Sequence, residues 1–119
     1  MKVAFVFTQA PYGSSRVREG IDALLAMSAY CDETDIGVFF LHDGVLNLLA
    51  KQQAELLLQK ETSAMLKLLA LYEIEQCFIS QEDVARYQLT DQSLLLPVKI
   101  LEQSALINRL RQAEKILTF

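Results

Sequence analysis

Short apolar runs alternate with helix-like segments along this 119-residue chain, and that alternation constrains its fold more than any other feature. Runs 3–7 and 36–41 are continuously apolar, which is typical of strands that are covered on both faces. Further strands are indicated at 74–79, within 94–101 and at 115–119, and helices at 16–30, 45–50, 63–72, 81–87 and 102–113. The pattern predicts one α/β domain over residues 1–119: a three-layer α/β/α sandwich with a mainly parallel five-stranded sheet and flavodoxin-like layering.

Three local expectations come from glycine and proline. Gly20 lies inside the 16–30 helix, where glycine costs about 1 kcal/mol relative to alanine, so we expect close packing there. Pro97 indicates that the fourth strand lies near a sheet edge or begins at that point. Asp43 and Gly44 follow the second strand and predict a tight turn, with Asp43 bonded to backbone and Gly44 at positive φ.

Composition narrows the classes of partner. Eleven Lys and Arg residues are scattered among fifteen Asp and Glu residues, giving a net charge of −4 and no basic stripe for nucleic acid. No apolar run approaches the ~18 residues that a membrane-spanning helix needs. Two well-separated cysteines and a start without a signal-like segment predict a reduced, cytoplasmic location. A hydrophobic content of 52% is high for a domain this small, and it favours a protein partner.

The 63–72 helix carries apolar residues around most of its circumference. We expect one face to lie against the sheet and the other against a second subunit, since a helix of this kind must be covered on two sides. The first predicted face consists of Met65, Leu68, Leu69 and Tyr72, and the second of Leu66, Ala70 and Leu71.

The loops after the strands are where an open parallel sheet binds ligands. Thr8, Ser14 and Ser15 follow the first strand and precede a helix, so they either form an ordinary turn and cap or hold a phosphate. Together with Asp43 and Gly44 they leave open an alternative function, a flavodoxin-like domain that binds a nucleotide or FMN.

Catalytic and metal-binding constellations are scarce in the sequence. His42 is the single histidine, and its neighbour Asp43 would point the opposite way on an extended segment, which disfavours a triad with Ser14. One histidine and two distant cysteines also lack the spacing of a metal site. We therefore expect neither a metal nor a cofactor.

The two cysteines are the remaining candidates for chemistry. Cys31 ends the first helix, and Cys77 lies within the third strand, where a free cysteine is usually a small buried hydrophobic residue. A thiol enzyme that acts through Cys77 stays an alternative, testable by alkylation. Ser80 stands where the next helix begins, and we expect it to cap that helix.

Several stretches taken together resemble the DsrE/DsrF-like sulfur-relay family, and within it the DsrF-type subunits. Their order and spacing cover the whole chain, although each stretch alone is a modest signal. The stretches are VAFVF at 3–7, APYG at 10–13, REGIDALLA at 18–26, VFFLHDGV at 38–45 and LLALYEIEQC at 68–77.

The resemblance implies a subunit of a hetero-oligomer with TusB-type and TusD-type subunits. Such a complex receives persulfide sulfur from TusA and passes it through TusE towards 2-thiolation of the wobble uridine of tRNA. In this family the persulfide cysteine belongs to the TusD-type subunit, at the start of the helix after the third strand. The corresponding residue here is Ser80, which cannot hold a persulfide, and Cys77 is the one nearby sulfur. The resemblance therefore implies a non-catalytic subunit. From its charge and hydropathy we expect the chain to contact neither nucleic acid nor membrane directly.

Overall fold

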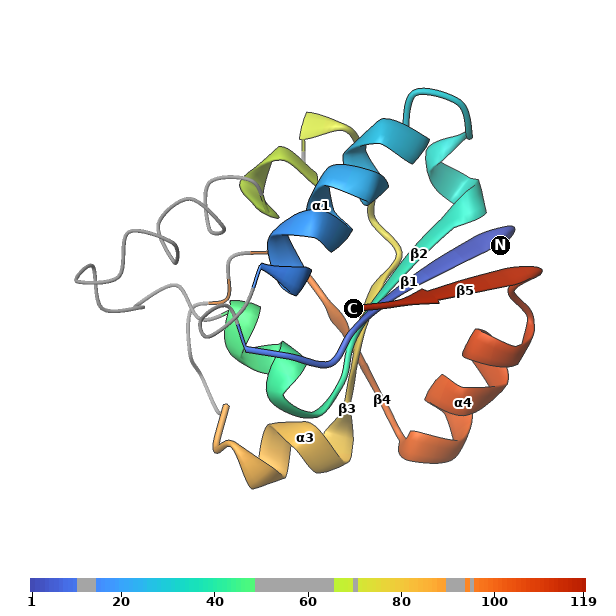
Figure 1. Cartoon of the computed structure of the whole chain (residues 1–119). Coiled ribbons are helices and arrows are strands. Elements are labelled where there is room, and N and C mark those ends of the chain that lie inside the picture. The colour runs from blue at the N-terminus through green and yellow to red at the C-terminus, as the bar shows by residue number, and fades with distance from the viewer. Residues whose placement is uncertain (11–14, 49–65, 70, 90–93, 95) are drawn as a thin grey trace.

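The computed structural model describes residues 1–10, 15–48, 66–69, 71–89, 94 and 96–119. Strands and helices alternate through these residues, as predicted, and Figure 1 shows them around one central sheet. The elements are β1 (Val3–Phe7), α1 (Arg16–Met27), the 3-10 turn η1 (Glu33–Asp35), β2 (Ile36–Phe40), the 3-10 helix η2 (His42–Leu48), β3 (Cys77–Ser80), α3 (Gln81–Arg86), β4 (Lys99–Leu101), α4 (Gln103–Arg111) and β5 (Lys115–Thr118).

The sheet has five strands in the order β4-β3-β2-β1-β5, and all four pairings are parallel. This confirms the predicted α/β fold and sharpens "mainly parallel" to fully parallel. Every residue of β1, β2 and β3 is buried, because these three strands occupy the centre of the sheet. Because all the strands are parallel, their carboxyl ends lie at the same end of the sheet, which we call the carboxyl edge. β4 and β5 are the two outermost strands.

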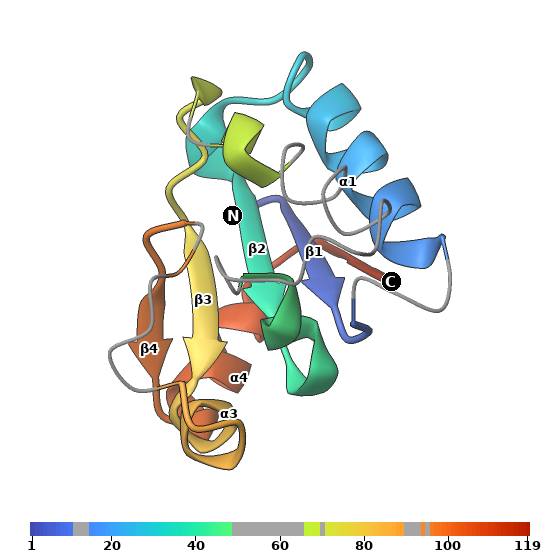
Figure 2. The ribbon, with the colours of Figure 1, turned by 90° about the vertical axis from the view of Figure 1, so that its left-hand side faces the viewer.

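Side chains from the two faces of the sheet pack into two separate apolar clusters. Phe5 and Phe7 of β1 point towards α1 and lie in one cluster with the buried face of that helix. Ala4 and Val6 point the other way and pack against Leu106 of α4. Figures 1 and 2 show α1 and α4 on opposite sides of the sheet, which confirms the three-layer arrangement.

Several predicted boundaries differ from those observed; α1, for example, ends at Met27 and not at residue 30. β3 begins at Cys77 rather than at residue 74, because the Cys77 N–H donates to the Glu75 carbonyl (2.9 Å) in a tight turn just before the strand. β4 is limited to Lys99–Leu101, since Pro97 has no N–H for a ladder hydrogen bond, and the strand lies at a sheet edge as expected. The short helix expected at 45–50 is the 3-10 helix His42–Leu48.

The predicted 63–72 helix is helical at residues 66–69 and 71, but its faces were assigned wrongly. Leu66 and Leu69, which were placed on different faces, are the fully buried pair. Tyr72 is 48% exposed, because the helix ends there and the chain reverses at Glu73 with a φ of 60°. Leu71 is 74% exposed, so an outward apolar residue is present; Met65 and Ala70 lie outside the described residues.

At Gly20 and Gly44 neighbouring atoms leave no room for a Cβ, which explains why glycine stands there. A Cβ on Gly20 would lie 2.6 Å from the Phe7 ring and 2.7 Å from that of Phe119, which confirms the predicted close packing. A Cβ on Gly44 would overlap the carbonyl oxygen of Phe7. The tight turn is present, with the Gly44 N–H donating to the Leu41 carbonyl (2.8 Å). The expected positive φ at Gly44 was wrong: in this turn it belongs to His42, at 53°.

Candidate functional site

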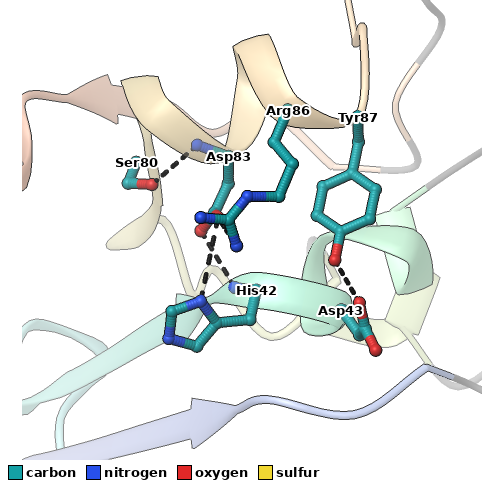
Figure 3. Close-up of polar contacts among 6 residues, drawn as sticks. All are labelled: His42, Asp43, Ser80, Asp83, Arg86 and Tyr87. Atoms are coloured by element: carbon teal, nitrogen blue, oxygen red, sulfur yellow. Dashed lines mark hydrogen bonds and ion pairs between the residues drawn. The ribbon is translucent and has the colours of Figure 1, made fainter.

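The carboxyl ends of β2 and β3 bring together two segments that are far apart in the sequence. His42 and Asp43 follow β2, and Ser80 is the last residue of β3, which pairs with β2 in parallel. Helix α3 begins directly after Ser80 and carries its polar side chains towards the β2 turn (Figure 3). This edge of a parallel sheet is the place where ligands and catalytic groups are usually found.

Ser80 is fully buried and acts as the N-cap of α3. Its hydroxyl oxygen accepts a hydrogen bond from the Asp83 N–H at 3.0 Å, drawn as a dashed line in Figure 3. The predicted capping role is confirmed. A hydroxyl oxygen held in this way supports the first turn of the helix, and no base among the described residues accepts a hydrogen bond from it.

Asp83 is the centre of the polar contacts at this edge. Its side chain is 5% exposed, and its Oδ2 accepts a hydrogen bond from the His42 N–H at 2.9 Å. Its Oδ1 lies 3.9 Å from both His42 Nδ1 and Arg86 Nη1. The carboxylate thus holds the residue at which the backbone turns with positive φ, and it links β2 to α3.

A second contact joins the same two segments. The Tyr87 hydroxyl donates to Asp43 Oδ1, and this hydrogen bond raises the pKa of Tyr87 above its usual value. Asp43 was expected to bond local backbone, but the contact that the structure gives goes to this distant tyrosine. The sequence carried no signal for either cross-link, because each joins residues more than 40 positions apart.

Among the residues that the structure describes, the arrangement at this edge does not pair a nucleophile with a base. His42 faces Asp83 rather than Asp43, and its side chain is 60% exposed. Ser14, the third member of the disfavoured triad, lies outside the described residues. Within the described part of the chain, no group of three or more His, Cys, Asp or Glu residues is placed to hold a metal ion.

The hydroxyls of the first loop are engaged within the protein. The Thr8 hydroxyl donates to the Phe119 carbonyl at 3.1 Å, and its N–H donates to the same oxygen at 2.8 Å. The Ser15 hydroxyl donates to Glu19 at 3.1 Å and does not cap α1. Two of the three hydroxyls considered for a phosphate therefore already have partners, while Ser14 lies outside the described residues.

The thiols lie away from the carboxyl edge. Cys77 is at the start of β3, 1% exposed in the apolar cluster beneath α1, and its Sγ is 3.8 Å from the Ile74 carbonyl oxygen. Burial raises the pKa of the Cys77 thiol to about 12. Since the thiolate is the reactive form, this environment suppresses nucleophilic chemistry. Cys31 is partly exposed and follows the end of α1.

A hollow of about 510 Å³ lies beside this edge, between the first turns of α3 and α4. Its polar lining consists of carboxylate, amide and hydroxyl groups, and neither cysteine contributes to it. The lining residues are Gln81, Glu82, Glu102, Gln103, Ser104 and Ile107.

We predict that Asp83→Ala lowers the free energy of unfolding by about 2 kcal/mol, because it leaves the His42 N–H without its acceptor. Asp83→Asn should cost less than half as much, since the amide oxygen still accepts that hydrogen bond. Urea unfolding measures both, and Asp22→Ala at an exposed position of α1 is the matched control. Equal stability of Asp83→Ala and the control would contradict the assigned role.

We also predict that iodoacetamide at pH 8 leaves Cys77 unmodified in the native protein. With a pKa of about 12, only about one thiol in ten thousand is ionised at that pH, and the side chain is enclosed. Peptide mapping after alkylation, with and without urea, gives the rate. Native alkylation of Cys77 as fast as in urea would support a reactive thiol instead.

The fold of this chain is similar to that of a protein of known structure. The chain is an α/β sandwich with a fully parallel sheet, and its structure superposes on the crystal structure of the ychN protein from E. coli with a TM-score of 0.82. That match covers 100% of this chain and 99% of the other at 22% identity, so it establishes the fold alone.

Sequence comparison then gives the family. The model of the DsrE/DsrF-like family matches residues 1–119, and the chain belongs to that family. It is 44% identical to the protein named "Protein TusC homolog" from Haemophilus influenzae and 47% identical to that from Pasteurella multocida, each over 119 residues and the full length of both chains. The Vibrio parahaemolyticus protein of the same name is 42% identical over 118 residues, covering 99% of this chain and 98% of that protein.

None of the described helices combines the length and the apolar character that crossing a bilayer requires.

Proposed function

We propose that this chain is a non-catalytic subunit of a cytoplasmic sulfur-relay complex that contains TusB-type and TusD-type subunits. The complex receives persulfide sulfur from TusA and delivers it through TusE for 2-thiolation of the wobble uridine of tRNA. This chain positions the subunit that bears the persulfide and carries no sulfur itself. Full-length similarity to the proteins named TusC homologs supports the assignment.

The observation that carries the non-catalytic role is the residue at the end of β3. Ser80 occupies the position where we place the persulfide cysteine of the TusD-type subunit, and a hydroxyl cannot form a sulfur–sulfur bond. Its oxygen is also committed to capping α3. The sulfur that is nearest in sequence, Cys77, is at the other end of the same strand and is buried.

Exposed apolar side chains support a role in an assembly. Leu71 and Tyr30 are among the large apolar residues that remain in solvent, at 74% and 87% exposure. Single exposed apolar residues are normal on a soluble protein, but aromatic residues gathered on one surface are typical of interfaces.

We predict that a Cys31→Ser/Cys77→Ser variant supports tRNA 2-thiolation at close to the wild-type level. The assay is the ratio of 2-thiouridine to unmodified uridine in tRNA from cells in which the variant replaces the native chain. Cys77→Ala serves as a second variant, because it places no hydroxyl in the apolar cluster.

Purification of the complex through a tagged TusD-type subunit shows whether each variant still assembles. Loss of thiolation with an intact complex would contradict the non-catalytic role. Retained thiolation in cells that lack this chain altogether would contradict the role in the relay.

A further inference from the structure

One apolar surface lies on the α1 layer, away from the edge that carries His42 and Ser80. A hollow of about 310 Å³ is lined there by Leu25, Ser28, Ala29 and Tyr72, between the end of α1 and the segment that follows residues 66–69. Tyr30 follows Ala29 and Leu71 precedes Tyr72 in the sequence, and both are large exposed apolar residues. Figures 1 and 2 show these two segments side by side at the top of the molecule, with α3 at the bottom. We call these six residues the Tyr72 surface.

The two segments of the Tyr72 surface are held in place by hydrogen bonds. The Tyr72 N–H donates to the Leu68 carbonyl at 3.0 Å, which keeps Tyr72 on the last helical turn. Gln76 Nε2 donates to the Thr34 carbonyl at 2.6 Å and joins the start of β3 to the loop after α1. The backbone on both sides of the hollow is therefore hydrogen-bonded, so that binding there would cost little conformational entropy.

Exposed acidic residues follow both segments of this apolar surface in the sequence. Asp32 and Glu33 follow Tyr30 closely, and Glu73 is adjacent to Tyr72; all three are exposed. None of the three has an ion-pair partner among the residues that the structure describes. Lys67, one helical turn before Leu71, is the nearest cation in sequence. Among the described residues of these two segments, the three carboxylates therefore outnumber the single lysine.

We propose that the Tyr72 surface docks a basic, partly apolar segment of another subunit. A large apolar side chain of that segment enters the hollow, and its Lys or Arg side chains meet Asp32, Glu33 and Glu73. Charge complementarity selects this occupant, because a second copy of the present chain would set carboxylates against carboxylates in a two-fold contact. This inference rests on the proposed function in one respect: it assumes that the partner is another subunit of the proposed sulfur-relay complex.

The test is co-expression with TusB-type and TusD-type subunits, followed by measurement of the affinity of this chain for the purified partners. Tyr30→Ser/Leu71→Ser removes apolar contact, and Asp32→Lys/Glu33→Lys reverses the charge. We expect each pair to weaken binding about tenfold or more. Wild-type binding should also weaken as salt is raised from about 0.1 M to 1 M, because screening acts on the charge pairs.

Matched controls are Ile116→Ser and Glu114→Lys, which change an exposed isoleucine of β5 and an exposed carboxylate just before that strand. They should bind as the wild type does, and thermal unfolding checks that every variant folds. Wild-type assembly that neither variant pair weakens would overturn the inference and leave the proposed function standing.

The remaining outcomes of this experiment decide which occupant the Tyr72 surface binds. Weakening by the apolar pair alone, without a charge or salt effect, would overturn the basic partner. Self-association of the chain that Tyr30→Ser/Leu71→Ser abolishes would make a second copy the occupant. Failure of the wild type to assemble with any subunit would overturn both proposals.

Discussion

The parallel pairing of β2 with β3 decides what stands at the carboxyl edge of this protein. Both strands are fully buried, so their register is fixed by packing, and it sets Phe40 beside Ile79. The residues that follow, His42 and Ser80, are thereby delivered to the same edge. Asp83 then connects them by accepting from the His42 N–H while its own N–H donates to Ser80. Asp83 therefore forms a structural link between the β2 turn and the first turn of α3 at this edge.

The position of Cys77 on β3 also explains why its thiol is unreactive. Cys77 is at the amino end of β3, in the apolar cluster on the α1 side of the sheet, where burial favours the neutral thiol. Ser80 is at the carboxyl end, where a thiol would lie at the start of a helix, the position that usually lowers a cysteine pKa. In the function that we propose, the difference between an oxygen and a sulfur atom at residue 80 distinguishes this chain from the subunit that carries the persulfide.

Much of the fold could be predicted from the sequence, because β1 and β2 are continuous apolar runs and helical segments alternate with the strands. Ser80 was recognisable as a cap for the same reason: its signal is local. The contacts of Asp83 with His42 and of Tyr87 with Asp43 could not be predicted, since they depend on the register of distant strands. The error at residues 66–72 has a similar cause, because the reversal at Glu73 decides which residues turn outward.

The most direct test of the central claim is the mass of each subunit during turnover. The relay is reconstituted with a cysteine desulfurase, cysteine and TusA, and the subunits are separated without reductant. We expect the TusD-type subunit to gain the mass of one sulfur atom and this chain to gain none. A sulfur atom on this chain that a reductant removes, and that TusE accepts, would contradict the account.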